Sequence, residues 1–367
     1  MRDDEAMARA LALAAGARRR TTPNPWVGCV IVADGTVVGE GATQPPGSDH
    51  AEIEALREAG PRARGATAYV TLEPCAHVGR TGPCADALID AGIARVVVAL
   101  TDPDPRVTRR GIERLRAAGV DVTEGVGLDA AATLLAPYLH HRRSGRAFCV
   151  VKSATSLDGR TAAADGTSRW ITGEAARADA HELRADSDAV VVGAGTALTD
   201  RPALTVRNAD PAPRTQPLRV LLDGRGRVPA EGPLFDPTLA PTLVVTTEHA
   251  SSHAVDAWRA AGAKVEAVDT GPSGVGVDPA ATLELLGRLD VVQALVEGGA
   301  TVHGSLLDAG LADRVVTYVA PGLLGARGRA AYGVAGPPSI DGFERWRLVG
   351  VRPLGDDVRL DYEPAGA

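Results

Sequence analysis

Residues 72–84 read LEPCAHVGRTGPC, and upstream of them residues 50–52 read HAE. Cys75 follows a predicted strand, whereas His50 and Cys84 each stand where a predicted helix begins. In α/β folds, functional side chains from distant parts of the chain gather on loops at the ends of such elements. The stretch therefore predicts a layered α/β domain in which one histidine and two cysteines meet.

The elements around this stretch predict a mixed sheet with helices packed on it. Apolar residues at helical spacing alternate with Val-rich runs, and Asp34-Gly35 between two such runs is typical of a hairpin turn. The resulting order, α-β-β-α-β-α-β-α-β, is that of a layered α/β domain. We expect helices over residues 4–18, 51–59, 84–91 and 109–118, and strands over residues 27–32, 37–39, 66–72, 95–100 and 120–123.

A second α/β domain is predicted after a polar stretch, HHRRSGR over residues 140–146, which is typical of a linker. A chain of 367 residues is long enough for two domains, which we place at residues 1–145 and 146–367. Stretches rich in Pro and Gly over residues 210–217, 225–237 and 271–279 are expected to be surface loops. Strands of the second domain are expected over residues 148–152, 189–192, 218–222, 242–246, 291–297 and 314–320.

Composition narrows the class of function. The net charge is −7, whereas proteins that grip a nucleic-acid backbone accumulate Lys and Arg, so small substrates are favoured. Four cysteines are too few for a disulfide framework in a chain of this length, which favours metal binding or catalysis. Apolar runs end far short of the roughly 20 residues that span a bilayer, and the acidic start is unlike a signal peptide. We therefore expect a cytoplasmic enzyme.

His50, Cys75 and Cys84 together form a candidate set of zinc ligands. A catalytic zinc site uses three protein ligands and keeps a fourth position for water, whose pKa the metal lowers toward neutrality. Glu52 is placed to carry protons from that water to a substrate, as the glutamate of zinc-dependent nucleobase deaminases does. In that general pattern two residues separate the cysteines, whereas eight separate them here. A helix N-terminus at Cys84 is expected to lower the pKa of its thiol.

Two other interpretations of these cysteines stay open at this point. A structural zinc site would need a fourth ligand, for which His77 is the nearby candidate, but it would leave Glu52 unexplained. Buried cysteines without a metal are the second interpretation, and Cys29 and Cys149, in Val-rich strands, are expected to be such core residues. We assign His77, in a Gly-rich loop beside Arg80, to substrate binding.

With eight residues between Cys75 and Cys84, the stretch over residues 72–84 resembles the signature of bacterial bifunctional riboflavin deaminase-reductases. This chain has Ala76 and Gly82 where the family usually carries Ser and Pro, and neither position is a proposed ligand. The stretch TPNPWVGCV over residues 22–30 resembles the family's substrate-binding turn, which implies that Asn24 contacts the pyrimidine. The resemblance implies a cytidine-deaminase-like, three-layer α/β/α domain that hydrolyses the 2-amino group from 2,5-diamino-6-(5-phosphoribosylamino)pyrimidin-4-one by means of a zinc hydroxide.

The resemblance continues through the second half, at residues 152–161, 168–172 and 192–207. It implies a dihydrofolate-reductase-like α/β domain in which NADPH supplies the hydride that reduces the ribosyl group to a ribityl chain. Asp200 is a candidate to assist protonation of the reduced sugar. The implied cofactor contacts are Ala154, Trp170, Thr196 and Asp200, and the implied substrate contacts are Lys152, Ser168, Arg184, Leu204 and Arg207.

A further cofactor element is predicted from the residues themselves. EGGAT, residues 297–301, follows a predicted strand and precedes a helical stretch over residues 302–309. Backbone N–H groups in such a turn can approach a pyrophosphate. Gly193 and Gly195 lack the third glycine of a Rossmann fingerprint, so that fold is not supported. We assign a sugar-hydroxyl contact of the substrate to Glu297, and the cofactor to Gly298, Gly299, Ala300 and Thr301.

Two other functions remain open from the sequence. One is a monofunctional nucleobase or nucleoside deaminase with a non-catalytic C-terminal domain, and the other is a catalytically dead binding module. The acidic charge disfavours a transfer-RNA substrate, and the intact set of metal ligands disfavours the dead module. The resemblance implies a homodimer or higher homo-oligomer, formed through the reductase domains, that acts on a pyrimidine ribosyl phosphate. From the net charge and the short apolar runs we expect no nucleic-acid or membrane partner.

Overall fold

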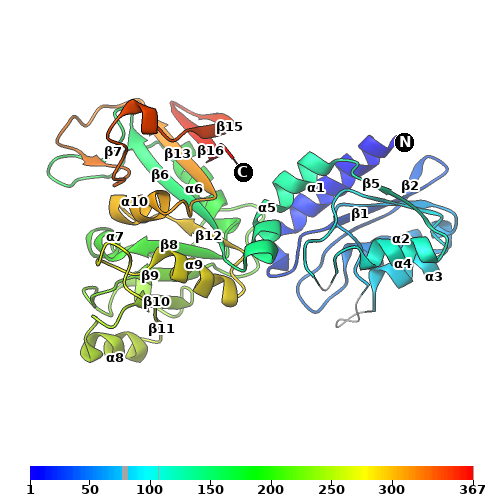
Figure 1. The fold of residues 1–367 in the computed structure, drawn as a ribbon, viewed down its shortest axis with the longest axis horizontal. Coiled ribbons are helices and arrows are strands. Elements are labelled where there is room, and N and C mark those ends of the chain that lie inside the picture. The colour runs from blue at the N-terminus through cyan, green and yellow to red at the C-terminus, as the bar shows by residue number, and fades with distance from the viewer. Residues whose placement is uncertain (77–81, 106, 367) are drawn as a thin grey trace. The chain divides into compact units, whose positions relative to one another are not determined.

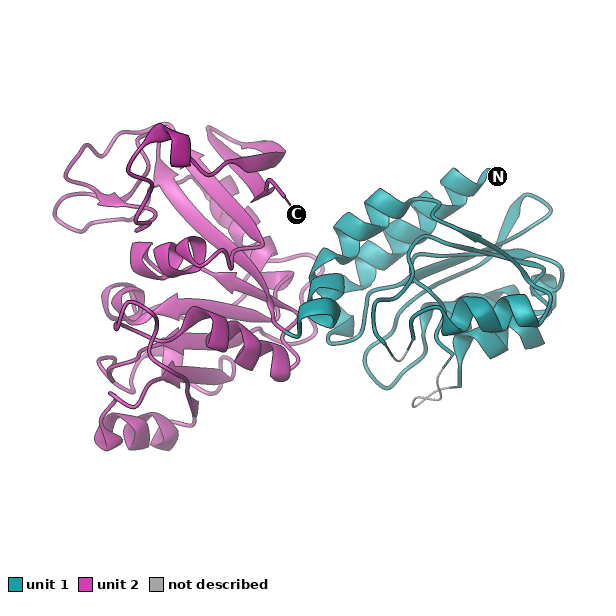
Figure 2. Ribbon diagram, in the orientation of Figure 1, with its two compact units in different colours: residues 1–145 teal, residues 146–367 magenta. Residues whose placement is uncertain are grey.

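The computed structural model describes residues 1–76, 82–105 and 107–366. It divides into two compact units, Met1–Gly145 and Arg146–Ala367, each with its own sheet (Figure 2). Both units are mixed α/β structures, as the sequence predicts. Within the described part of the chain, no helix is both long enough and apolar enough to cross a membrane.

The first unit is a three-layer sandwich around a five-stranded sheet of order β2-β1-β3-β4-β5 (Figure 1). The first three strands in that order pair antiparallel, and β3, β4 and β5 pair parallel. Helices α1 and α5 cover one face, and α2, α3 and α4 cover the other. The elements are α1 Asp3–Thr21, β1 Gly28–Ala33, β2 Thr36–Ala42, α2 Ala51–Ala59, η1 Gly60–Ala63, β3 Thr67–Val70, α3 Cys84–Asp90, β4 Arg95–Val98, α4 Arg110–Ala117, β5 Asp121–Glu124 and α5 Leu128–Ser144.

Close packing of α2 on the sheet depends on a glycine. A Cβ atom added at Gly41 in β2 would lie only 2.1 Å from the carbonyl oxygen of Ala51, at the start of α2. Any side chain there would push the first turn of α2 outward, together with His50, which is the N-cap of this helix. Gly41 thus helps to set the depth at which His50 lies.

The predicted linker over residues 140–146 is wrong for most of its length. Helix α5 continues to Ser144 and ends at Gly145, whose positive φ of 75° is typical of a helix C-terminus. The polar run HHRR belongs to the last turn, where positive side chains interact favourably with the helix dipole. Composition alone does not distinguish such a turn from a linker.

The second unit is built on a nine-stranded sheet of order β11-β10-β9-β8-β12-β6-β13-β16-β15 (Figure 1). Neighbours pair parallel from β11 to β13, and the hairpin β15–β16 adds antiparallel strands at one edge. The elements are β6 Phe148–Ser156, β7 Arg160–Ala162, α6 Glu174–Ala185, β8 Ala189–Gly193, α7 Ala194–Asp200, β9 Leu218–Leu222, η2 Pro233–Phe235, β10 Thr242–Thr246, α8 Ser252–Ala260, β11 Lys264–Ala267, α9 Pro279–Arg288, β12 Gln293–Val296, α10 Ala300–Asp308, β13 Arg314–Ala320, β14 Arg329–Ala330, η3 Ile340–Gly342, β15 Trp346–Leu354 and β16 Asp357–Pro364.

Two apolar cores lie on the two faces of this sheet. Val191 belongs to one core, with side chains from α9 and α10, whereas its neighbours Val190 and Val192 belong to the other, with side chains from α7 and α8. This alternation follows from the two-residue period of a strand. One predicted surface loop, residues 225–237, is wrong in part, because Leu234 and Phe235 are buried in the second core.

Candidate functional site

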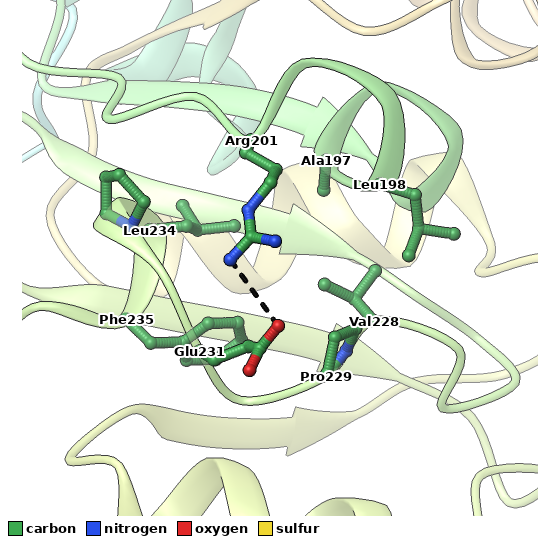
Figure 3. Close-up of a pocket in the computed structure, with 9 residues that line it drawn as sticks. Ala197, Leu198, Arg201, Val228, Pro229, Glu231, Leu234 and Phe235 are labelled. Atoms are coloured by element: carbon green, nitrogen blue, oxygen red, sulfur yellow. Dashed lines mark hydrogen bonds and ion pairs between the residues drawn. The ribbon is translucent and has the colours of Figure 1, made fainter.

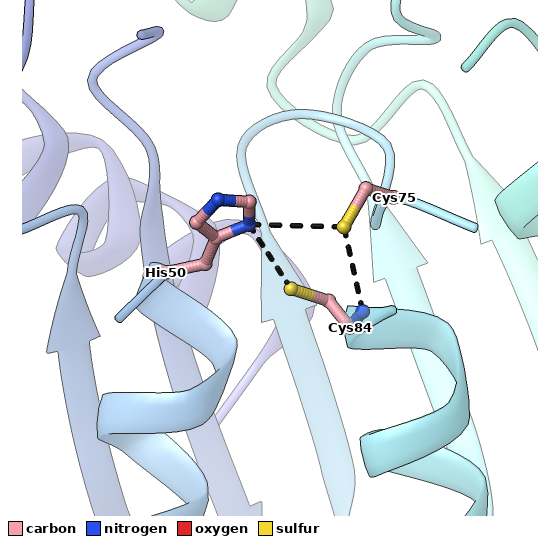
Figure 4. A group of neighbouring side chains, drawn as sticks. All are labelled: His50, Cys75 and Cys84. Atoms are coloured by element: carbon pink, nitrogen blue, oxygen red, sulfur yellow. Dashed lines mark hydrogen bonds between the residues drawn. The ribbon is translucent and has the colours of Figure 1, made fainter. Parts of the chain in front are cut away.

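His50, Cys75 and Cys84 come together at one end of the first unit's sheet (Figure 4). His50 is the N-cap of α2, Cys75 lies beyond the end of β3, and Cys84 is the first residue of α3. One ligand atom from each residue lies within 4.8 Å of the other two. The backbone N–H of Cys84 also donates to the Cys75 sulfur at 3.4 Å, which fixes the two cysteines relative to each other.

The spacing of these atoms fits a zinc ion. His50 Nδ1 lies 3.2 Å from the Cys84 sulfur and 3.7 Å from the Cys75 sulfur. With ordinary zinc–ligand bond lengths, a tetrahedral site separates a nitrogen from a sulfur by roughly 3.5 Å and two sulfurs by roughly 3.8 Å. Two thiols and one imidazole are ligands that zinc prefers, and three of them leave one position open.

The pKa values of the three candidate ligands are shifted in different directions. Hydrogen bonds from Cys84 and His50 lower the pKa of Cys75 to about 4, although burial opposes them. The neighbouring Cys75 sulfur raises the pKa of Cys84, and burial adds to this shift. The expected lowering of the Cys84 pKa by the helix N-terminus stays a prediction for the metal-bound site. Hydrogen bonding to Cys75 also raises the pKa of His50 to about 9.

Glu52 lies one residue inside α2 and is 4% exposed. Burial raises the pKa of its carboxyl to about 7, and the charge of His50 opposes this shift. The Cys84 thiol is a hydrogen-bond partner of this carboxyl. A buried carboxyl group that is close to a metal ligand and has a pKa near neutrality can both accept and return a proton.

Among the described residues, no hydrogen bond joins Asn24, the predicted pyrimidine contact, to the metal ligands. Asn24 is half-buried in the turn after α1, where its backbone N–H donates to the Thr21 carbonyl at 2.8 Å. Arg142 of α5 donates to the neighbouring Pro23 carbonyl at 3.1 Å and thereby holds this turn. His77 lies outside the described residues.

In the second unit, Lys152 and Glu297 lie where β12 ends beside the middle of β6. Val151 of β6 and Val191 of β8 both pair with Val296, the last residue of β12, whereas β6 itself continues to Ser156. Lys152 and Glu297 come next in that register, and they are half-buried neighbours whose charges attract. Ligands of open α/β sheets bind at the carboxyl ends of strands.

Arg184 of α6 binds Glu297 through two hydrogen bonds of 2.7 Å. Its third nitrogen donates to the Thr205 carbonyl at 3.0 Å. Both side chains were predicted to contact substrate, and here they contact each other. Burial lowers the pKa of Lys152, although the carboxylate of Glu297 opposes this effect.

The predicted cofactor residues of α7 and α10 are also neighbours. A Cβ atom added at Gly299 would lie 3.4 Å from the Thr196 hydroxyl, and one added at Gly298 would lie 3.3 Å from the Gly193 nitrogen. The turn over residues 298–301 thus runs directly beside the start of α7, and Ala300 and Thr301 form the first turn of α10. Backbone N–H groups at such a turn can bind a pyrophosphate.

The remaining predicted residues of this unit lie in different environments. Trp170 is 70% exposed, and the Arg177 guanidinium lies 4.6 Å from its ring centroid. Leu204 has a positive φ of 54° and is buried in the core, so only its backbone is available for contacts. Arg207 contacts the His181 ring at 3.3 Å. Ala154 and Ser168 are half-buried, as is Asp200, whose carbonyl accepts from Arg169.

Three charged or polar side chains of α6 lie on one face of the helix, and only Arg184 was predicted as a site residue. Arg177, His181 and Arg184 are spaced i, i+4 and i+7, which places them on the same side of a helix. That periodicity is visible in the sequence and could have identified Arg177 and His181. Burial and the charges of Arg184 and Arg207 lower the pKa of His181 to about 4.

A shallow pocket of about 430 Å³, including open solvent, lies between α7 and residues 228–235 (Figure 3). Ala197 and Leu198 form one side, Val228 and Pro229 form the other, and the Arg201–Glu231 ion pair spans it at 3.4 Å. None of the predicted site residues that the structure describes lines this pocket. We therefore assign it to neither predicted site.

Both units match families of known proteins. Residues 1–100 match the cytidine and deoxycytidylate deaminase zinc-binding region, and residues 147–360 match the RibD C-terminal domain. The riboflavin biosynthesis protein RibD of Escherichia coli K12 is 42% identical over 98% of this chain and 99% of its own length. That of Chlamydia trachomatis is 45% identical over 88% of this chain and 85% of its own length.

Solved structures give the same result. Acinetobacter baumannii RibD aligns with a TM-score of 0.89 and 40% identity, and covers 99% of each chain. A Thermotoga maritima protein aligns with a TM-score of 0.86 and 31% identity, again over 99% of each chain. The latter is described as a diaminohydroxyphosphoribosylaminopyrimidine deaminase and 5-amino-6-(5-phosphoribosylamino)uracil reductase.

Proposed function

The chain belongs to the RibD family of bifunctional deaminase-reductases, and from this premise we propose which of its residues carry the two reactions. It is an enzyme of riboflavin biosynthesis, with a zinc-binding deaminase domain and a reductase domain that uses NADPH. The alternative of a deaminase with a non-catalytic C-terminal domain is not supported, because the RibD C-terminal domain matches residues 147–360. We place the two domains at residues 1–145 and 146–367.

For deamination, we assign the metal to His50, Cys75 and Cys84 and the proton transfers to Glu52. Zinc held there supplies an acidified water for attack on the pyrimidine ring. Glu52 Oε accepts one proton from the attacking water and gives it to the ring nitrogen; it then accepts the remaining proton of that oxygen and gives it to the amine, which leaves as ammonia. The observation that carries this assignment is the zinc-like spacing of three ligand atoms beside a buried carboxyl group whose pKa is about 7. Asn24 and His77 are assigned to the pyrimidine substrate.

For reduction, we assign NADPH to the carboxyl ends of β8 and β12, beside the middle of β6. NADPH supplies the hydride, and the protein supplies positioning and charge. Lys152 is assigned to hold the ribosyl oxygen where negative charge develops, and the burial that lowers its pKa strengthens such an interaction. The carboxylate of Glu297 attracts the Lys152 ammonium and binds Arg184, and both residues stay assigned to the substrate. The assigned cofactor contacts are Ala154, Trp170, Thr196, Asp200, Gly298, Gly299, Ala300 and Thr301, and the other substrate contacts are Ser168, Leu204 and Arg207.

Metal removal separates the two activities and tests this assignment. We expect a chelator to abolish release of ammonia from the diaminopyrimidine phosphate, and zinc to restore it. NADPH oxidation with the deaminated intermediate should continue in the same chelated sample, because its site lies on the second sheet. Deamination that survives complete zinc removal would refute the metal assignment.

We further propose that two copies pair through the edge strand β15. Leu348, Val349 and Val351 of this strand are 51%, 40% and 59% exposed, and Phe343 just before it is 56% exposed. An apolar edge strand with free backbone groups is suited to pairing with a second copy of itself. Sedimentation should give a dimer for the wild type and a monomer for Val351→Lys. We propose a cytoplasmic location as well, since the reductase depends on the NADPH maintained there.

A further inference from the structure

Glu73 lies two residues before the metal ligand Cys75. Its side chain binds a helix that is distant in sequence. Its carboxylate is 4% exposed and accepts four backbone N–H groups. One oxygen accepts from Gly111 at 3.0 Å and Ile112 at 3.3 Å, and the other accepts from Arg109 at 2.9 Å and Asp102 at 3.3 Å. All four partners are donors, which fits a carboxylate and no neutral side chain.

These contacts replace the missing cap of α4. The N-cap of this helix is Arg109, whose side chain has no acceptor, and it makes no side-chain cap. The N–H groups of Gly111 and Ile112 in the first turn have no partner within the helix, so they would be left unsatisfied without Glu73. The negative charge also lies where the helix dipole favours it.

A second contact ties the same segment to the same turn. A Cβ atom added at Gly111 would lie 1.8 Å from the carbonyl oxygen of Pro74, so the backbone of Pro74 rests directly on α4. Cys75 follows, and its carbonyl accepts from Ala85 at 3.1 Å while its sulfur accepts from the Cys84 N–H. The segment over residues 73–75 is therefore held by α4 on one side and by α3 on the other.

We propose that Glu73 is a positioning residue for Cys75, and that by capping α4 it sets where the Cys75 sulfur meets the metal. This inference rests on the zinc assignment made above, and it adds a residue outside the ligand set. Glu73 makes no contact with substrate or metal in this scheme. Its effect passes through Pro74 to the ligand.

Two variants disturb this link by different routes. Glu73→Gln keeps the volume but turns an NH₂ group toward N–H donors, so at least two of the four lose their acceptor. Gly111→Ala keeps Glu73 and improves the helix propensity of α4, but its methyl group must displace Pro74. Glu113→Gln removes an exposed carboxylate from the same helix, and Leu115→Ala weakens the buried side of α4 at a residue outside the contacts with Glu73 and Pro74 described above.

The experiment measures zinc affinity of the full-length variants by competition with a chromophoric chelator. We expect Glu73→Gln and Gly111→Ala to weaken zinc binding by about 10-fold or more, as outer-shell changes do, and the two controls to leave it unchanged. Substitution with Co²⁺ gives a spectroscopic check, since the thiolate-to-cobalt absorption band should weaken in the first two variants only. NADPH oxidation with the deaminated intermediate should be unchanged in all four, which shows that the second unit is intact.

Wild-type affinity and cobalt spectra in both Glu73→Gln and Gly111→Ala would overturn the proposal. An equal loss of affinity in Leu115→Ala would also overturn it, because the effect would then be one of general stability. If Glu73→Gln fails to fold, Gly111→Ala decides the matter alone. A wild-type protein that binds no zinc would refute the zinc assignment itself, and this inference with it.

Discussion

The guanidinium of Arg184 and the carboxylate of Glu297 face each other through two hydrogen bonds of 2.7 Å, although 113 positions separate them in the chain. The side chains are only 17% and 11% exposed. Lys152 adds a second positive charge near the same carboxylate. Glu297 therefore neutralises two buried cations, and the site depends on its remaining ionised.

This dependence predicts a loss of stability at acidic pH. Burial alone would raise the pKa of Glu297, but the charges of Arg184 and Lys152 lower it to about 2. A depressed carboxylate pKa stabilises the fold above the ordinary value of 4.5, and this contribution is lost as pH falls from 4.5 toward 2. The free-energy difference between wild type and Glu297→Gln should therefore shrink by about 2 kcal/mol between pH 6 and pH 3.

Urea unfolding followed by tryptophan fluorescence measures this difference. Trp170, Trp258 and Trp346 lie in the second unit, so the signal reports mainly on that unit. The other carboxyl groups titrate in both proteins and cancel in the comparison. A difference that stays constant from pH 6 to pH 3 would contradict the lowered pKa of Glu297.

Replacement of Lys152 should abolish reduction and spare deamination. We expect Lys152→Met to lower kcat for NADPH oxidation by about 100-fold or more, since the charge that faces the reacting sugar oxygen is lost. The chain provides a matched control in Lys264, its only other lysine, which is exposed at the start of β11. A Lys152→Met enzyme that reduces as fast as Lys264→Met would exclude any role of the amine.

The secondary structure near the metal was largely predictable because each element there has a local signal. The hairpin of β1 and β2, helix α2 and the start of α3 at Cys84 follow from turn residues and apolar spacing, and all are observed. Helix α5 was not predicted, and its last turn was assigned to a linker because a run such as HHRR is equally typical of one. Local composition cannot distinguish these two structures.

Partners that are distant in sequence were not predictable. The ion pair of Arg184 with Glu297 was not predicted, because nothing in the chain indicates that these two residues bind each other. Glu73 caps a helix that begins many residues later, whereas rules for helix caps consider only neighbouring residues. Register between strands, which brings Lys152 beside Glu297, becomes visible only once the sheet is assembled.

Two substitutions separate metal binding from proton transfer in the deaminase. Glu52→Gln should keep zinc and lose deamination by about 10²- to 10⁴-fold, because the amide cannot carry a proton. Cys84→Ser should lose both zinc and activity. Metal content by atomic emission and ammonia release check the two results, and Glu54→Gln, which removes a carboxylate paired with Arg57, serves as the control. Full deamination by Glu52→Gln would assign the proton transfers elsewhere.

Trp170 is expected to bind the cofactor through its exposed ring. The ring already lies 4.6 Å from the Arg177 guanidinium, and stacking of this kind contributes about 1 kcal/mol. Trp170→Ala should raise KM for NADPH roughly 10-fold with a smaller change in kcat. NADPH should quench the fluorescence of wild type and of Trp346→Phe, but leave that of Trp170→Ala nearly unchanged. Equal quenching in all three proteins would place the cofactor away from this ring.

Arg219 should stabilise the second unit without taking part in either reaction. Its fully buried guanidinium donates to the carbonyl oxygens of Pro233, Asp236 and Ala240, and so fastens the segment that forms one side of the pocket in Figure 3. Arg219→Met would remove the cost of burying a charge, which offsets part of the loss of stability. However, it leaves three carbonyl groups without their hydrogen-bond donor.

We therefore expect Arg219→Met to destabilise the second unit by about 2–4 kcal/mol. Hydrogen exchange should show residues 233–240 opening first, since these residues lose their common anchor. Arg225→Met is the matched control, because that side chain is exposed in the same connection after β9 and should unfold like wild type. Deamination should be equal in both variants, because its site belongs to the other unit. Wild-type exchange over residues 233–240 in Arg219→Met would mean that apolar packing of Leu234 and Phe235, and not the guanidinium, holds this segment.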